Sequence, residues 1–126
     1  MSDFTLIAVP SSGAGGLDGE RSGHFGHCDC YTLVPVADGK IGGVRILANP
    51  PHEEGGCLRP VELLASNGVD AIVAIGMGAR PLAGFQAAGI GVYFEDASPR
   101  IGDAVQRMID GDVVVFDGTH SCGGCH

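Results

Sequence analysis

Basic residues are scarce in this sequence. Seven Lys and Arg stand against fifteen Asp and Glu, which gives a formal net charge of -8. A chain of this kind has no basic stripe with which to neutralise phosphates. Aromatic residues make up 6% of the chain, with no Trp, and they do not alternate with basic ones. We therefore expect no nucleic acid partner.

Long apolar runs are missing as well. Hydrophobic residues make up 44% of the 126 residues, yet no run approaches membrane-spanning length. The chain begins Met-Ser-Asp-Phe, with an acid where a secretory signal has basic residues, and the apolar stretch that follows is too short for a signal. There is no internal repeat and no linker long enough to divide the chain. These absences predict a soluble, cytoplasmic, single-domain protein with no membrane partner.

Three strand-like runs occupy the first part of the chain. The run 4–9 is rich in strand formers and is followed by a Ser/Gly stretch, 11–16, which predicts a loop. The runs 31–36 and 41–47 are separated by Asp38-Gly39, a dipeptide that supplies the positive φ angles of a tight hairpin. We therefore expect these two strands to pair antiparallel.

Helices and strands alternate in the rest of the chain. The patterns predict helices over 58–67, 80–88 and 98–110, and strands over 69–75, 90–94 and 113–116. Ser98 is expected to cap the third helix, with Pro99 at its first position. The alternation favours parallel pairing with right-handed crossovers. Together with the hairpin it predicts an α/β domain with a mixed sheet of about five or six strands and about three helices.

The first group of candidate metal ligands lies between the glycine-rich stretch and the second strand. Four potential ligands fall within seven residues, namely His24, His27, Cys28 and Cys30. In a regular strand the two cysteines would share a face, about 6.6 Å apart. Thiolates on one tetrahedral zinc are about 3.8 Å apart, so this pair suits a multinuclear cluster better unless the backbone bends here. The alternative is that either cysteine packs in the core as a small apolar residue.

A second group, His52 and Cys57, precedes the first predicted helix. Cys57 lies directly before that helix, and the positive end of a helix dipole lowers a thiol pKa, which favours metal binding or redox reactivity. The alternative is a solvated loop histidine and a buried cysteine.

The third group lies at the end of the chain, where His120, Cys122 and Cys125 form a C-x-x-C pattern flanked by histidines. The pattern is typical of metal binding, and it also matches a haem-attachment signature, although that chemistry belongs to exported proteins. A tail that binds metal adventitiously is the alternative. We expect residues 1–117 to form a metal-cluster-binding α/β domain and residues 118–126 a Cys/His-rich tail.

Gly76, Met77 and Gly78 join a predicted buried strand to a helix. Backbone amides at a helix start can receive an anion or the sulfides of a cluster, although a tight turn explains both glycines equally well. In open α/β sheets, ligands bind in such a crevice. The acidic pairs Glu53-Glu54 and Glu95-Asp96 predict solvated loops rather than an acid/base constellation.

The order of these motifs resembles the dinitrogenase iron-molybdenum cofactor biosynthesis proteins, which include NifX-like proteins and the C-terminal domain of NifB-like proteins. The resemblance spans about residues 4–115 and rests on His24-Phe25-Gly26, Asn49-Pro50 with His52 and Gly55-Gly56, residues 76–81, and Ala88-Gly89-Ile90. It implies a ribonuclease H-like α/β fold without nuclease activity that carries or stores metal–sulfur clusters. It also implies that the segments holding His24, His52 and Gly76 converge at one end of the sheet. His27, Cys28, Cys30 and the tail cysteines depart from the usual family pattern, which leaves the cluster type open.

We therefore predict a non-catalytic carrier of an iron–sulfur or molybdenum-containing cluster. Its partners would be cluster-assembly or acceptor proteins, and it would be a monomer or weak homodimer. The predicted metal ligands are Cys28, Cys30, Cys57, Cys122, Cys125, His27, His52 and His120, and the predicted cluster contacts are His24, Gly76, Met77 and Gly78. Two alternatives stay open, because soft thiolates also bind zinc. One is a dithiol redox protein that uses Cys122 and Cys125, and the other is a structural zinc-binding domain.

Overall fold

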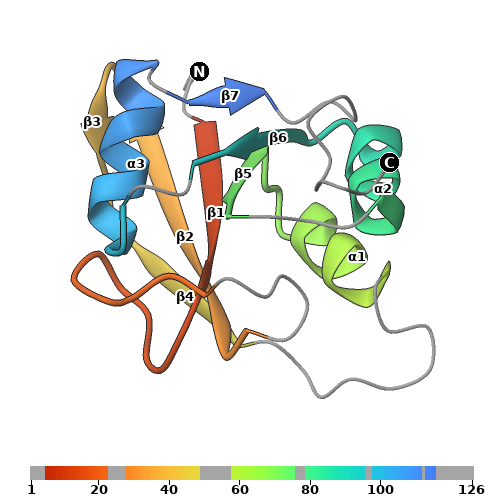
Figure 1. Ribbon diagram of the computed structural model, residues 1–126, viewed down its shortest axis with the longest axis horizontal. Helices are drawn as coiled ribbons and strands as arrows, with labels where there is room; N and C mark the ends of the chain where they lie inside the picture. Colours follow the sequence, from red (N-terminus) through yellow and green to blue (C-terminus); the bar gives the residue numbers. More distant parts are fainter. Residues whose placement is uncertain are drawn as a thin grey trace.

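A mixed sheet forms the centre of the molecule (Figure 1). The computed structural model describes residues 5–22, 28–48, 58–75, 79–95, 98–111 and 113–115. The strands in these ranges are β1 (Thr5–Ser11), β2 (Cys30–Ala37), β3 (Lys40–Ile41), β4 (Arg45–Ala48), β5 (Ala71–Ala74), β6 (Gly91–Phe94) and β7 (Val114–Val115). Their order is β3-β2-β1-β5-β6-β7, and β4 pairs with β2 beside β3. The predicted mixed α/β sheet is confirmed.

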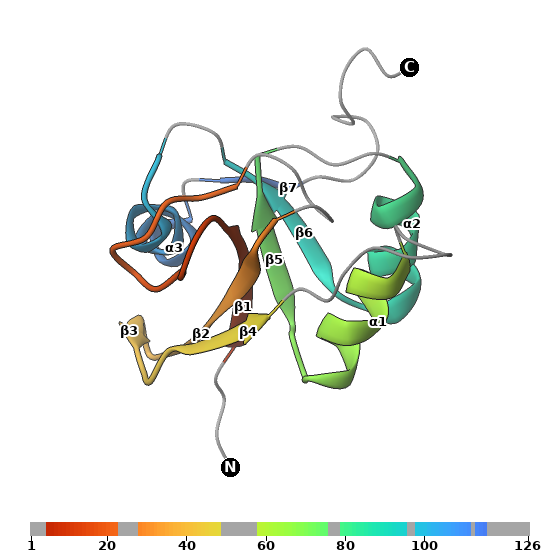
Figure 2. The ribbon, with the colours of Figure 1, turned by 90° about the horizontal axis from the view of Figure 1, so that it is seen from below.

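In the described part of the chain, three helices cover the two faces of this sheet. They are α1 (Leu58–Ser66), α2 (Ala79–Ala88) and α3 (Ile101–Asp110). Helices α1 and α2 lie on one face and α3 lies on the other (Figure 2). None of the helices in the described ranges is long and apolar enough to cross a membrane. The finer ribonuclease H-like assignment stays a prediction from the resemblance.

Two apolar clusters fill the space between the sheet and its helices. The first lies under α1 and α2 and includes Leu64, Phe85 and the β2 residues Tyr31 and Leu33. The second lies under α3 and includes Val34 of the same strand. Side chains alternate between the two faces of a strand. Strand β2 is therefore buried on both faces in its first half.

Glycines end the elements of this fold as the sequence predicts. Gly68 and Gly89 follow α1 and α2 with φ angles of 79° each, in the left-handed region that suits the end of a helix. Asp38 and Gly39 have φ angles of 54° and 74°, and they connect β2 to β3 in the predicted antiparallel hairpin. These features depend on local sequence, because the backbone conformation selects the residue.

The predicted strand 41–47 is divided in the structure into β3 and β4. The ladder pairs Val36 with Ile41 and Leu33 with Arg45, so residues 42–44 lie opposite only Val34 and Pro35. One extra residue on one strand makes a bulge, which bends the strand and interrupts its pairing. β3 and β4 consequently share one position beside β2.

The predicted start of the third helix is wrong. Arg100, not Ser98, is the residue before α3, and its side chain makes no capping bond. The first helical N–H groups, those of Ile101 and Gly102, donate to the carbonyls of Gly19 (3.1 Å) and Leu17 (2.9 Å). A loop from the start of the chain therefore supplies the cap that a Ser side chain would otherwise provide.

The predicted direction of the last strand is also wrong. β7 pairs antiparallel with β6, with Phe94 opposite Val114. β5 and β6 do pair parallel, as expected. The direction of a two-residue edge strand depends on the path that the chain takes after α3, for which the local sequence carries no signal.

Candidate functional site

Two of the predicted ligands, Cys28 and Cys30, lie within the described residues. The remaining predicted site residues lie outside them, namely His24, His27, His52, Cys57, Gly76, Met77, Gly78, His120, Cys122 and Cys125. Their positions stay predictions. The structure does show where the chain leaves and re-enters the fold on either side of most of these segments.

Several of these flanking residues lie at one end of the sheet. Cys30 is opposite Ser11 at the end of β1 and opposite Ala48 at the end of β4, just before the segment that holds His52. Strand β5 runs parallel to β1 and ends at Ala74, just before the Gly76 turn. The carboxyl ends of parallel strands form one edge of a sheet, where α/β proteins bind ligands. The segments predicted to converge thus begin at a common edge.

The last described strand, β7, runs away from this edge of the sheet. β7 runs antiparallel to β6, so the chain passes from a position opposite Phe94 to one opposite Tyr93 and leaves the carboxyl edge. Residues 116–126 lie outside the described residues. To contribute ligands at this edge, the tail has to reverse direction.

Cys28 and Cys30 are both buried, with exposed fractions of 6% and 4%, and neither forms a disulfide. Cys28 lies in a bend before β2 and belongs to the apolar cluster under α1 and α2. Cys30 begins β2, and its thiol donates to the Gly13 carbonyl at 3.6 Å, on the side of the glycine-rich loop. Two cysteines in a regular strand would be about 6.6 Å apart, or about two residue rises. This spacing does not apply here, because Cys28 precedes the strand.

The glycine-rich loop, residues 12–22, packs closely against the start of β2. Gly15 has a φ angle of 70°, and a Cβ atom there would lie 2.8 Å from Thr32 Oγ1 and 3.0 Å from Cys30 Sγ. Thr32 Oγ1 accepts the Gly16 N–H at 3.1 Å and lies 2.8 Å from the Ser11 hydroxyl. Ser11, predicted to be loop, is the fully buried last residue of β1. These hydrogen bonds and close contacts hold the loop against the start of β2.

Asp29, between the two cysteines, ties this end of β2 to the same loop. Its carboxylate accepts the Gly13 N–H at 2.7 Å, and its own N–H donates to the Ser11 carbonyl at 3.0 Å. The bend that contains Cys28 is thus connected both to β1 and to the loop.

Burial raises the pKa of the Cys30 thiol above its ordinary value, and the neighbouring Cys28 and Asp29 raise it further. The metal-free protein therefore holds Cys30 as the neutral thiol at neutral pH. Thiolate is the form that ligates metal, so metal binding at this residue must displace a proton.

The described residues do not complete a metal site by themselves. Within them, no group of three or more His, Cys, Asp or Glu side chains is placed to hold a metal ion. Cys28 and Cys30 supply at most two soft donors. This donor chemistry fits a metal–sulfur cluster only if the segments outside the described residues add further ligands.

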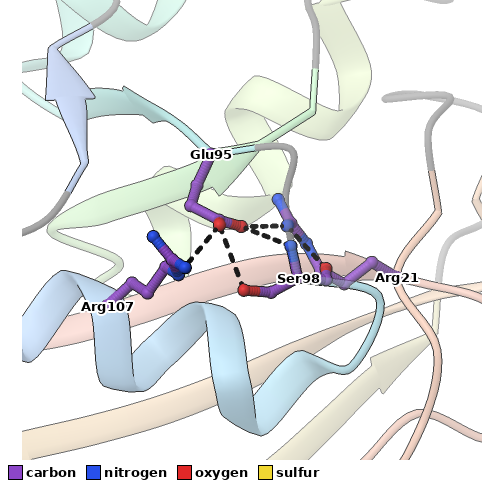
Figure 3. A network of polar contacts seen from close by, with 4 residues as sticks. All are labelled: Arg21, Glu95, Ser98 and Arg107. Carbon is purple, nitrogen blue, oxygen red and sulfur yellow. Dashed lines mark hydrogen bonds and ion pairs between the residues drawn. The ribbon is translucent and has the colours of Figure 1, made fainter.

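A buried ion pair lies at the same end of the molecule, and sequence reasoning missed it. Arg21 Nη1 donates to Glu95 Oε1 at 2.6 Å, and the two side chains are 1% and 3% exposed (Figure 3). Glu95 Oε2 accepts the Ser98 hydroxyl at 3.0 Å and pairs with Arg107 Nε at 3.3 Å. The prediction that Glu95 is solvated is wrong. Its place directly after the apolar run 90–94 was the available signal, because a charge that is buried beside apolar residues is rarely left unpaired.

The comparisons with known proteins agree with this fold. The sequence model of the family described as dinitrogenase iron-molybdenum cofactor matches residues 5–111. An uncharacterized protein of Methanocaldococcus jannaschii is 27% identical over 114 residues, which cover 88% of this chain and 91% of that protein.

Solved structures share the same architecture. The apo form of the orange protein from Desulfovibrio gigas superposes with a TM-score of 0.78 at 27% identity, covering 94% of this chain and 98% of that one. A Thermotoga protein described as a NifB candidate superposes with a TM-score of 0.76 at 23% identity, covering 98% and 100% of the two chains, and shows the fold alone. The family match spans the whole glycine-rich loop, both described cysteines and all three helices. The chain belongs to the dinitrogenase iron-molybdenum cofactor family.

Proposed function

We propose that this protein binds and carries a metal–sulfur cluster, iron–sulfur or molybdenum-containing, and delivers it without catalysing a reaction. In this proposal it acts in the cytoplasm, as a monomer or weak homodimer, with cluster-assembly and acceptor proteins as partners. Family membership supports the role in iron-molybdenum cofactor chemistry. The orange protein is described in an apo form, a term that implies a ligand-bound form of that protein.

One observation carries the proposal most directly. Two buried thiols, Cys28 and Cys30, lie at the edge of the sheet where the segments holding His52 and Gly76 also begin. A buried site limits the access of water and chelators to a bound cluster. Thiol sulfur is the soft donor that iron–sulfur and related clusters prefer. The remaining ligands would come from His27, His52, Cys57, His120, Cys122 and Cys125, and His24 with residues 76–78 would contact the cluster.

The test is anaerobic reconstitution followed by metal analysis and a visible spectrum. Purified protein is incubated with iron(II) and sulfide in one sample and with tetrathiomolybdate in another, and each is then desalted. Sulfur-to-metal charge-transfer absorption with stoichiometric metal supports a cluster. A colourless protein that retains stoichiometric zinc contradicts the proposal and favours the structural zinc domain.

Two variants on one strand separate loss of a ligand from loss of packing. Cys30→Ala and Val34→Ala each shorten a buried side chain of β2, and only the first removes a thiol. We expect Cys30→Ala to lower cluster loading and Val34→Ala to keep it per folded molecule. Equal loading in the two variants would show that Cys30 is a core residue and no ligand.

A further inference from the structure

Arg21 anchors the glycine-rich loop to residues that lie between β6 and α3. The Arg21 side chain donates to Glu95 at 2.6 Å and to the Ser98 carbonyl at 3.0 Å. Its backbone N–H donates to the Pro99 carbonyl at 3.0 Å. Glu95 in turn accepts from the Ser98 N–H at 3.3 Å. The main chain of Arg21 is therefore held by Pro99, and its side chain is held by Glu95 and Ser98, as Figure 3 shows for the side chain.

Ser11 connects this anchor to the cysteines. Its backbone forms an antiparallel bridge with Arg21 and is paired with Cys30 in the ladder between β1 and β2. Its carbonyl also accepts the Asp29 N–H. Arg21 and Cys30 are thus both paired with Ser11, and two strand spacings place Arg21 roughly 10 Å from Cys30. A shift of the backbone at Arg21 would therefore be transmitted to the thiols through Ser11.

Buried ion pairs are poor sources of stability, because removing two charges from water offsets most of their attraction. Such a pair instead fixes the relative orientation of the groups that it joins. The planar guanidinium donates along fixed lines, and Nη1 holds Glu95 and the Ser98 carbonyl at once. Apolar residues of similar volume could fill the same space without fixing the loop at one angle.

We propose that the Arg21–Glu95 ion pair is a positioning element that holds the backbone around Cys28 and Cys30 in place. By doing so it slows the loss of a bound cluster, a consequence that rests on the function proposed above. Among the described residues, the ion pair is connected to Cys30 through the backbone of Ser11. It acts through Ser11 and the loop, so its removal should expose the thiols even where the fold persists.

The first measurement uses the metal-free protein. Cys28 and Cys30 are alkylated with iodoacetamide under native reducing conditions, and peptide mass spectrometry follows each cysteine separately. The double variant Arg21→Met/Glu95→Leu removes both charges, so neither is left buried alone. We expect alkylation of both thiols to be roughly tenfold faster than in the wild type, through local opening of the loop.

Two controls isolate positioning from stability. Ile90→Ala shortens a buried side chain of the apolar cluster that also contains Cys28, outside the loop, so it shows the effect of lost packing alone. Arg107→Met removes the other cation on Glu95, which lies on α3 and is 42% exposed. We expect both controls to alkylate at near the wild-type rate. A double variant that alkylates no faster than Ile90→Ala would overturn the proposal.

The second measurement uses protein reconstituted with iron(II) and sulfide. We expect the double variant to lose absorbance to a chelator roughly 10- to 100-fold faster than the wild type, by analogy with the loss of metal affinity when groups that orient metal ligands are removed. Cluster loss at the wild-type rate would overturn the effect on retention. A wild type that takes up no cluster would refute the proposed function, while the alkylation rates would still decide whether the ion pair positions the thiols.

Discussion

Gly15 has little room for a side chain beside the candidate site. Its φ angle is 70°, and the space where a Cβ would lie is already occupied by Thr32 Oγ1 and Cys30 Sγ. The left-handed conformation costs a residue with a side chain about 1 to 2 kcal/mol, and overpacking a buried site costs about 1 to 3 kcal/mol more. We therefore expect Gly15→Ala to lower the free energy of unfolding by about 2 to 5 kcal/mol, measured by chemical denaturation.

Gly13 provides the matched control for this substitution. It has a similar φ angle of 65°, but nothing lies within 4 Å of the position of its Cβ. Gly13→Ala should show only the backbone cost of about 1 to 2 kcal/mol. Equal losses for the two variants would mean that the loop does not press on Cys30 and Thr32 as the structure places it.

Cys30 should make the stability of the metal-free protein depend on pH in the alkaline range. Its pKa is raised by burial and by Cys28 and Asp29, so the folded protein keeps this proton to a higher pH than the unfolded chain. The resulting stabilisation is complete below the thiol pKa of the unfolded chain, about 8.5, and is lost as the pH rises through the folded pKa. We expect the difference in unfolding free energy between wild type and Cys30→Ala to shrink as the pH rises above about 8.5. Denaturant titrations under reducing conditions measure it, and a constant difference would mean that Cys30 titrates normally.

At the scale of the elements, the buried ion pair joins the glycine-rich loop to the start of α3. Arg21→Met alone leaves the Glu95 carboxylate buried, with the half-exposed Arg107 as its remaining cation. We expect this variant to lose about 3 kcal/mol of stability, and Arg107→Met, on a pair that is partly solvated, to lose at most about 1 kcal/mol. Arg21→Met/Glu95→Leu should recover much of the loss. A double variant as unstable as Arg21→Met would show that hydrogen bonds, not the unpaired charge, dominate.

The elements that the sequence predicts correctly are those with local signals. Asp38-Gly39 and the glycines after α1 and α2 demand particular φ angles, and those angles end an element wherever it is packed. The start of α3 has no such signal, because its first N–H groups are satisfied by carbonyls of residues 17 and 19. The antiparallel direction of β7 and the burial of Glu95 likewise depend on partners distant in sequence. The sequence also does not predict how Cys28 and Cys30 lie relative to β2, because no residue pattern marks the bend before Cys30.

At the scale of the whole molecule, the described fold is complete before the cysteine-rich tail begins. The last described residue, Val115, belongs to β7, and the tail residues are small, polar or potential ligands. We expect deletion of residues 120–126 to leave the melting temperature of the metal-free protein within about 2 °C of the wild type, because no large apolar side chain is lost. We also expect faster loss of a reconstituted cluster, measured by chelator challenge.

A full-length variant separates the tail's thiols from its length. Cys122→Ser/Cys125→Ser keeps every residue of the tail in number and removes only its sulfur ligands. It should lose the cluster as fast as the deletion does. If both proteins retain the cluster like the wild type, the tail is no part of the site, and the ligands lie between residues 24 and 78.

Because the glycine-rich loop caps α3, two backbone amides of that helix can be used to measure whether the loop is docked. The first amides of a helix normally have no partner within the helix and exchange rapidly with solvent. Here the Ile101 and Gly102 amides are bonded to the Gly19 and Leu17 carbonyls, so their protection from deuterium requires that the loop be closed. Their exchange rates would therefore report each opening of residues 12–22 from a helix that carries no predicted ligand. Metal-dependent slowing at these two amides would reveal, from a distance, that ligand binding tightens the loop.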